Sequence, residues 1–166
     1  MKKILYFWLV VFSIITYKAQ STTWNGSSWS NGRPNTSTDA IISADYSQSA
    51  NFAVKNLTIN SGTNFTLKSN FQVIVYGSVV NNGTMIVESN AAFIQRSDNS
   101  TYSGSGTVIV KREANLKRND YNYWSSPVAN QNIYNFSIGT PTRYFFKYDE
   151  KDDRFYANEI TANSTF

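Results

Sequence analysis

The segment Asn60-Ser61-Gly62-Thr63 recurs as Asn81-Asn82-Gly83-Thr84, and more loosely as Gly104-Ser105-Gly106-Thr107, at nearly even spacing along the chain. An apolar strand-like run follows each copy, so that turn and strand repeat together. A repeat of this length is typical of a solenoid, in which one repeat forms one coil. Because Gly adopts positive φ without steric cost, we expect Gly62 and Gly83 to occupy turn positions with positive φ.

The fold class that this pattern predicts is all-β, a short right-handed parallel β-helix over residues 20–111. Each coil of such a solenoid covers the apolar face of the coil before it. No window has the spacing of an amphipathic helix, so we expect the mature chain to be almost helix-free. A β-sandwich built from regularly spaced hairpins is the alternative that the patterning leaves open. The expected strands are Ala40–Ile42, Phe52–Ile59, Phe65–Leu67, Phe71–Val80, Thr84–Val87, Ala92–Gln95 and Thr107–Lys111.

The composition narrows the chemistry available to the protein. The 166 residues include neither Cys nor His, which excludes disulfides, thiol and imidazole nucleophiles, and the usual zinc sites. Asn, Ser and Thr together make up about a third of the chain, and only 16% of the chain is charged. We therefore expect no catalytic residue, no metal site and no cofactor.

The N-terminus has the pattern of a signal peptide. Lys2 and Lys3 precede an apolar run from Ile4 to Thr16, which is too short for a stable membrane span. We expect residues 1–19 to be removed, which leaves a secreted or outer-surface protein without a membrane anchor. The formal net charge of +4 then falls to +1, because three lysines leave with the leader. A charge this small disfavours nucleic acid as a partner.

The sequence changes character after about residue 112. Aromatic residues crowd into residues 112–166, and the Asn/Gly turns stop. Arg143–Tyr148 and Arg154–Ala157 are expected to form a hairpin whose acidic tip is Asp149–Asp153. We interpret residues 112–166 as an aromatic β extension, truncated at its end, so that the chain is a fragment of a larger protein.

Several segments together are similar to a known family. They are Trp24–Gly32 with the following Pro34 and Asp39–Ile42, Asn56–Gly62, Val79–Thr84 and Tyr121–Val128. As a set they resemble the N-terminal β-helical region of exported Bacteroidetes proteins that are cargo of the type IX secretion system. The resemblance implies an adhesin-like surface protein that the secretion machinery exports, with a solenoid of undefined activity. It carries no catalytic residue to this chain.

Five aromatic residues are the candidate ligand-binding residues. Trp24 and Trp29 flank Gly-Ser turns, where exposed indoles stack on sugar rings; the alternative is that they cover the open first coil. Tyr121, Tyr123 and Trp124 alternate as on a strand, which would place the two phenol rings on one face and the indole on the other. The alternative use of these three residues is to pack the hairpin onto the last coil.

The function expected from these features is structural or adhesive display without catalysis. Its partners would be surface glycans or other cell-surface proteins. A carbohydrate-binding module is one alternative, and a fragment of a polysaccharide lyase or glycoside hydrolase is the other, supported by fold analogy alone. A calcium loop at Asp149 is disfavoured, because the sixth and twelfth positions are Arg154 and Ile160 rather than Gly and Glu.

Overall fold

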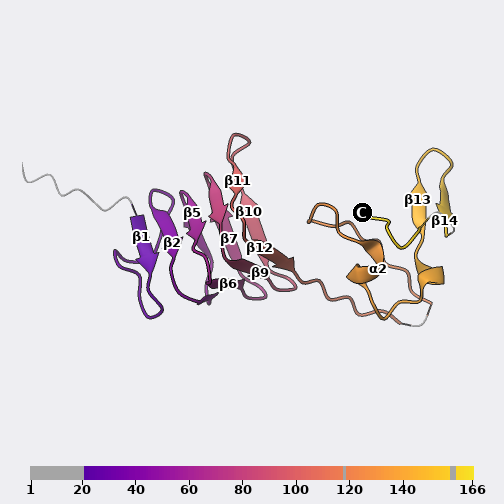
Figure 1. The fold of residues 1–166 in the computed structure, drawn as a ribbon, viewed down its shortest axis with the longest axis horizontal. Coiled ribbons are helices and arrows are strands. Elements are labelled where there is room, and N and C mark those ends of the chain that lie inside the picture. Colours follow the sequence, from indigo (N-terminus) through magenta and orange to yellow (C-terminus); the bar gives the residue numbers. More distant parts are fainter. Residues whose placement is uncertain (1–20, 118, 158–159) are drawn as a thin grey trace, which may run out of the picture. The chain divides into compact units, whose positions relative to one another are not determined.

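The computed structural model describes residues 21–117, 119–157 and 160–166 (Figure 1). The expected leader, residues 1–19, lies outside these described residues. The chain divides into two compact units between Arg112 and Glu113, and each unit is described by itself. Among the described residues, no helix has the length and apolar character needed to cross a membrane.

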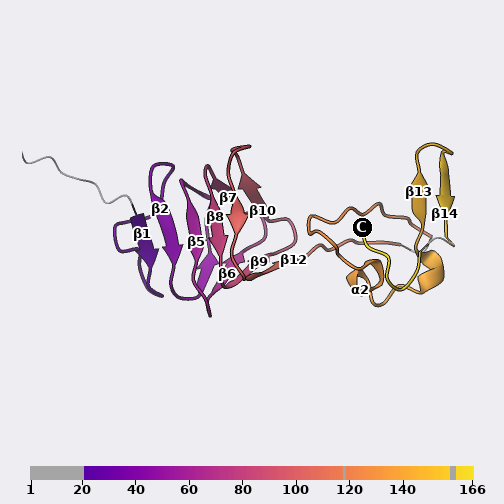
Figure 2. The ribbon, with the colours of Figure 1, turned by 45° about the horizontal axis from the view of Figure 1, so that its top comes forward.

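The first unit is a parallel β-solenoid of about four turns, which confirms the expected fold class (Figure 2). Every strand pair in it is parallel, and each sheet collects one strand from successive coils. One sheet contains β1 (Ser21–Trp24), β2 (Asp39–Ile42), β5 (Leu57–Ile59), β8 (Val79–Asn81) and β11 (Tyr102–Ser103). The second contains β3 (Tyr46–Gln48), β6 (Asn64–Leu67), β9 (Thr84–Val87) and β12 (Thr107–Val110). The third contains β4 (Phe52–Val54), β7 (Gln72–Val75) and β10 (Ala92–Gln95).

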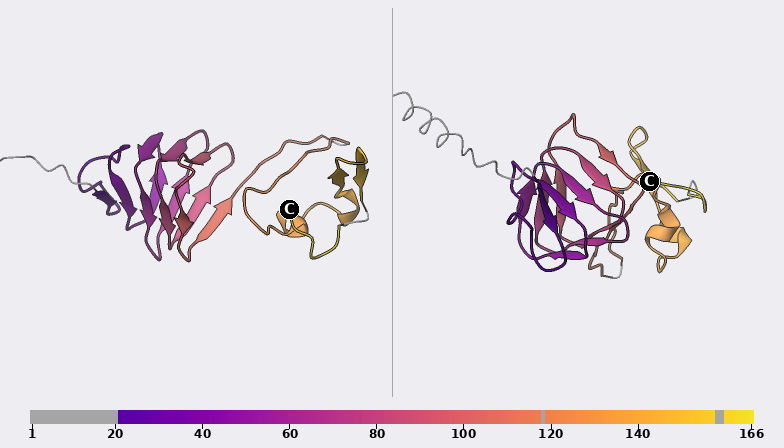
Figure 3. Two further views of the ribbon diagram at one scale, coloured as in Figure 1. Left: turned by 90° about the horizontal axis from the view of Figure 1, so that it is seen from above. Right: turned by 60° about the vertical axis from the view of Figure 1, so that its left-hand side comes forward.

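Columns of apolar side chains fill the interior of the solenoid. Strand residues alternate between buried and partly exposed, as period-two strands require, so that one row of each sheet points inward. Strands of successive coils lie side by side in register, so their inward residues form rows that run from coil to coil (Figure 3). Several apolar side chains have no exposed surface at all: Ile42, Val54, Leu57, Ile59, Phe65, Leu67, Val73, Val75 and Val79.

Two long apolar runs that the sequence presents as single strands are each broken by a corner. Phe52–Ile59 divides into β4 and β5, and Phe71–Val80 divides into β7 and β8. The side chain of Asn56 holds the first corner: its amide nitrogen donates to Asp39 Oδ1 at 2.8 Å, and its oxygen accepts from the Ser78 amide at 2.8 Å. The corners were missed because apolar residues continue on both sides of them.

Three strands were missed because their residues are polar. They are β1, β3 and β11. In β1, Thr22 is buried and its hydroxyl donates to the Gly32 carbonyl at 2.8 Å. In β3, Gln48 is fully buried and its amide donates to the carbonyls of Ala50 and Gln72, both at 2.8 Å. Backbone pairing with the next coil and these side-chain bonds satisfy the Thr22 hydroxyl and the Gln48 amide nitrogen. Gln48 Oε1 is buried and has no hydrogen-bond partner among the described residues.

The two glycines of the sequence repeat differ in their conformation. Gly62 has φ of +76°, as expected, but Gly83 is absent from the positive-φ residues, so the expectation for Gly83 was wrong. A Cβ at Gly83 would collide with the backbone oxygens of Asn60 and Thr63 in the preceding coil. Gly83 is therefore required by close packing between coils rather than by its backbone angles.

The second unit has little regular structure. It contains the short helix α2 (Ile133–Phe136), the 3-10 turn η1 (Thr142–Tyr144) and the antiparallel hairpin of β13 (Lys147–Asp149) and β14 (Arg154–Tyr156). The hairpin confirms the expected pairing, although the first strand begins later than expected because η1 occupies its first residues. The expected strand through Tyr121–Trp124 was wrong, because these residues have no regular secondary structure.

Candidate functional site

Trp24 and Trp29 belong to an aromatic cluster at the first coils of the solenoid. Their rings lie 5.7 Å apart, and Tyr46 contacts both, at 4.7 Å from Trp24 and 5.3 Å from Trp29. Tyr46 also stacks on the buried ring of Phe65 at 5.8 Å. The cluster is completed by Phe52, whose ring lies 6.4 Å from that of Trp29. Both indoles are thus packed against the core.

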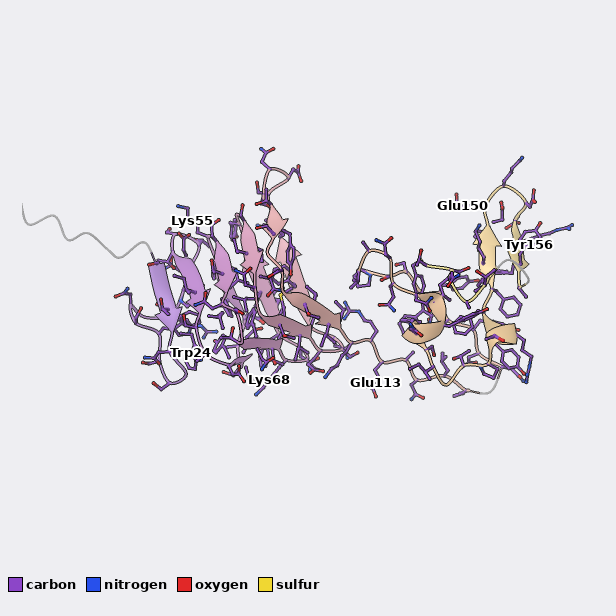
Figure 4. The ribbon with its side chains drawn as sticks, viewed as in Figure 1. Trp24, Lys55, Lys68, Glu113, Glu150 and Tyr156 are labelled. Carbon is purple, nitrogen blue, oxygen red and sulfur yellow. The ribbon has the colours of Figure 1, made fainter. Side chains whose placement is uncertain are left out.

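This packing leaves little of the two indoles for a ligand. Each is only partly exposed, and the planes of the two rings are tilted by 57°. The indole nitrogen of Trp24 donates to the Asp45 carbonyl at 3.0 Å, so its polar edge is already bonded. Figure 4 labels Trp24 beside the first strands. The geometry favours covering the first coil over sugar binding, because stacking on a pyranose requires a flat, open ring face.

Tyr121, Tyr123 and Trp124 lie in the second unit and separate into two kinds. The two tyrosines are each 77% exposed. Trp124 is half-buried and packs edge-on against Phe136 at 4.9 Å. The structure therefore leaves two of these three expected binding residues open and places the third against its own unit.

The two exposed tyrosines extend a larger exposed surface, which we call the aromatic face: Tyr121, Tyr123, Phe146, Tyr148 and Phe155. Tyr121 lies 6.0 Å from Phe146, and Tyr123 lies 5.8 Å from Phe155. Phe155 is also the cross-strand partner of Tyr148, at 5.1 Å. Phe146, Tyr148 and Phe155 are between 39% and 50% exposed. Sequence reasoning missed them as site residues, although the pairing of the two hairpin strands was a signal that could have found them.

The aromatic face combines ring surfaces with phenol hydroxyl groups. The Tyr148 hydroxyl donates to Asp153 Oδ1 at 2.7 Å, and this hydrogen bond to a carboxylate raises the pKa of Tyr148 above its usual value. The same hydrogen bond orients the Tyr148 side chain. Ring faces beside hydroxyl groups bind the C–H surfaces of sugars and offer hydrogen bonds to their hydroxyls.

The acidic residues of the hairpin tip are used to hold the turn. Asp149 Oδ1 accepts from the Lys151 amide at 2.9 Å and from the Asp152 amide at 3.3 Å. Asp152 Oδ2 accepts from the Tyr156 hydroxyl at 3.0 Å. In the part of the chain that the structure describes, no three carboxylates gather in a group that could hold a metal ion. These carboxylates therefore act as turn-forming groups, as their positions after a strand suggest.

Comparison with known proteins identifies a family but no activity. The family model described as Domain of unknown function (DUF8693) matches residues 16–166, which include both units. No curated protein and no solved structure matches the chain.

Proposed function

Since the chain belongs to the DUF8693 family, whose function is undefined, we propose its function from the geometry: it is an exported surface protein that adheres to glycans without cleaving them. The observation that carries this proposal is the aromatic face. Five aromatic side chains gather on one small unit and remain exposed, although the same chain packs its other aromatic cluster against the solenoid core. Large exposed apolar surfaces of this kind mark interaction sites.

Adhesion requires a scaffold that does not deform, and the solenoid is suited to that role. Its strands pair from coil to coil through backbone hydrogen bonds, and buried apolar side chains form its core. The proposed location, secreted or at the outer cell surface, rests on the leader pattern and on the resemblance to type IX secretion cargo. Display of many copies at a surface would compensate for weak binding of each copy.

The test is glycan binding by residues 20–166 with paired variants in the second unit. A panel of neutral and acidic polysaccharides is screened by affinity electrophoresis, and the tightest ligand is measured by calorimetry. The double variant Tyr121→Ser with Tyr123→Ser should weaken binding by about tenfold, because each lost stacking contact is worth about 0.5–1.5 kcal/mol. Tyr144→Ser is the matched control, since Tyr144 is 55% exposed but stacks with Arg143 outside the aromatic face.

Two results would contradict the proposal. One is equal binding by the double variant and the wild type, which would remove the aromatic face from the site. The other is release of new reducing ends or unsaturated products during incubation, which would favour a lyase or hydrolase.

A further inference from the structure

A second surface with ligand-binding chemistry lies on the outer face of the β4, β7 and β10 sheet. The strand register continues one residue beyond each strand, because the Tyr76 amide donates to the Val54 carbonyl at 3.0 Å and the Arg96 amide to the Val75 carbonyl at 2.9 Å. Lys55, Tyr76 and Arg96 are therefore neighbours on successive coils; we call them the basic column. Val54 and Val75, which precede the first two, are fully buried, so the column residues point outward.

The two cations of the basic column are exposed and without an acidic partner. Among the described residues, no carboxylate lies within ion-pair distance of Lys55 or Arg96. Lys111 provides a contrast, because its ammonium group pairs with Glu88 Oε1 at 2.8 Å. Arg33 donates to the carbonyls of Ala50 and Asn51, whereas the guanidinium of Arg96 donates to the Tyr76 hydroxyl within the column, at 3.5 Å. Lys55 is labelled on the solenoid in Figure 4.

An aromatic ring lies between the two cations. Tyr76 is 38% exposed, and the guanidinium carbon of Arg96 lies 5.7 Å from its ring centroid. Adjacent strands are about 4.8 Å apart, so the Cα atoms of Lys55 and Arg96, two coils apart, are separated by roughly 10 Å. The basic column thus presents two positively charged side chains on strands two coils apart, with the Tyr76 ring on the strand between them.

An apolar strip borders the basic column on the same sheet face. Ala53, Ile74 and Ile94 are register partners of one another and occupy the outward positions two residues before the column. Ile94 is 38% exposed, and the other two are partly exposed. A ligand that fits must therefore offer C–H surface along one side and negative charges along the other, repeated along a line.

We propose that the basic column is a binding site for a linear acidic polysaccharide, a chain of sugar rings that carry carboxylate or sulfate groups. Carboxylates on alternate rings of such a chain repeat at a distance comparable to the Cα separation of Lys55 and Arg96, and the C–H surface of a sugar ring packs against Ile74 and the exposed part of Tyr76. This site would give the proposed adhesive function a specific ligand class. It rests on that proposed function only in taking the ligand to be a glycan.

The charge density of the surface disfavours two other anionic partners. Nucleic-acid binding at physiological salt requires several neutralised phosphates, and lipid surfaces are bound by clusters of about four to eight basic residues. The basic column supplies two cations. Two cations suffice for a polysaccharide because apolar contact with the ring supplies the remaining attraction.

The test measures binding of residues 20–166 to polygalacturonate oligomers by calorimetry at low and high salt, with a neutral glucan oligomer for comparison. The column variant, Lys55→Gln with Arg96→Gln, should weaken polygalacturonate binding about tenfold and reduce its salt dependence. The matched control is Lys68→Gln with Arg112→Gln, which removes the same charge from exposed positions outside the column. Tyr76→Ser should weaken binding without changing the salt dependence, since no charge is removed. Circular dichroism verifies that each variant keeps its β structure.

The outcomes separate this inference from the proposed function. Loss of acidic-glycan binding in the column variant, with binding retained in the Tyr121→Ser and Tyr123→Ser variant, supports the basic column. Loss only in the tyrosine variant supports the aromatic face and overturns the basic column. Equal weakening by the matched control would show a net-charge effect and overturn the inference, as would tighter binding of anionic vesicles or RNA through Lys55 and Arg96. Failure of every glycan to bind would overturn both proposals.

Discussion

The two units of this chain contain many aromatic side chains but use them in opposite ways. In the solenoid, the aromatic cluster continues into a core where Phe65 has no exposed surface. In the second unit, no described residue is buried, and aromatic pairs such as Tyr123 with Phe155 remain open to solvent. Aromatic content alone therefore does not indicate a core. An aromatic side chain is buried only where it points inward and the next coil covers it.

The difference originates in the sequence pattern. Strand residues of the solenoid alternate between inward and outward positions and stay in register over consecutive coils, so an inward side chain meets another from the neighbouring coil. In the second unit, β13 and β14 pair only with each other and form a two-stranded sheet. A two-stranded hairpin has no second layer of its own, so its apolar side chains stay accessible.

The largest change in the free energy of unfolding is expected from a pair of variants that truncates one Phe to Ala in each unit. Phe65→Ala should lower the free energy of unfolding of the solenoid by about 4 kcal/mol, because it empties a fully buried site. Phe155→Ala should lower that of the second unit by about 1 kcal/mol, because the ring is half exposed. Urea denaturation followed by hydrogen exchange of peptides from each unit measures both values. Similar losses would contradict the contrast between the units.

A second pair of variants separates close packing from backbone conformation. Gly83→Ala should destabilise the solenoid by about 3 kcal/mol, because the new Cβ meets backbone oxygens of the preceding coil. Gly62→Asn should cost no more than about 1 kcal/mol, since the space around Gly62 is open and Asn tolerates positive φ. The melting temperatures of the two variants measure these costs. A larger cost at Gly62 than at Gly83 would refute this assignment of roles.

A third variant tests the buried polar position in the solenoid. Asn81 is fully buried; its amide nitrogen donates to the Tyr102 hydroxyl and the Thr107 carbonyl, both at 3.0 Å, and its oxygen accepts from the Gly83 amide. Asn81→Ala should cost about 2 kcal/mol, because these groups lose their partners. The midpoint of urea denaturation measures the loss. An unchanged midpoint would mean that water replaces the amide without cost.

The smallest expected effect is a pH dependence at the first coils. Hydrogen bonds from the Asn64 amide and side chain hold the pKa of Asp45 below its ordinary value of 3.8. A lowered folded-state pKa adds stability above the unfolded pKa, and this stability is lost as the pH falls toward the folded value. Between about pH 5 and pH 2, the melting temperature should therefore fall less in Asp45→Asn than in the wild type. Identical slopes would exclude a contribution from Asp45.

The repeat in the sequence predicted the solenoid, but it could not place its corners. Leu57 pairs with Val79, before a corner of the coil, and Asn64 pairs with Thr84, after that corner. The number of residues that separates the two paired positions is larger before the corner than after it.

The separation of Gly62 from Gly83 lies between these two values and matches neither. The two glycines consequently occupy different positions in their corners. The looser repeat is the structurally equivalent one, because Gly106 follows Gly83 by the same shift that relates Thr107 to its partner Thr84.

The candidate site was predicted only in part, for a similar reason. Tyr121 and Tyr123 stand out in the sequence as a dense aromatic segment, and the structure leaves both exposed. Their contacts with Phe146 and Phe155 join residues that are far apart in the sequence, which requires the fold of the second unit. The basic column was hidden because its three residues lie on successive coils and form no local pattern.

We propose that the solenoid is a self-sufficient scaffold and that exposed side chains outside its core make the contacts with glycans. Hydrogen exchange of residues 20–166, with and without a glycan that binds, tests both parts of this proposal. We expect slow exchange in β5, β6, β7 and β8 without ligand, and new protection on binding around Tyr121–Tyr123 and Phe146–Phe155, or beside Lys55 and Arg96 for an acidic glycan. Rapid exchange in those strands without ligand, or new protection confined to Trp24 and Trp29, would contradict it.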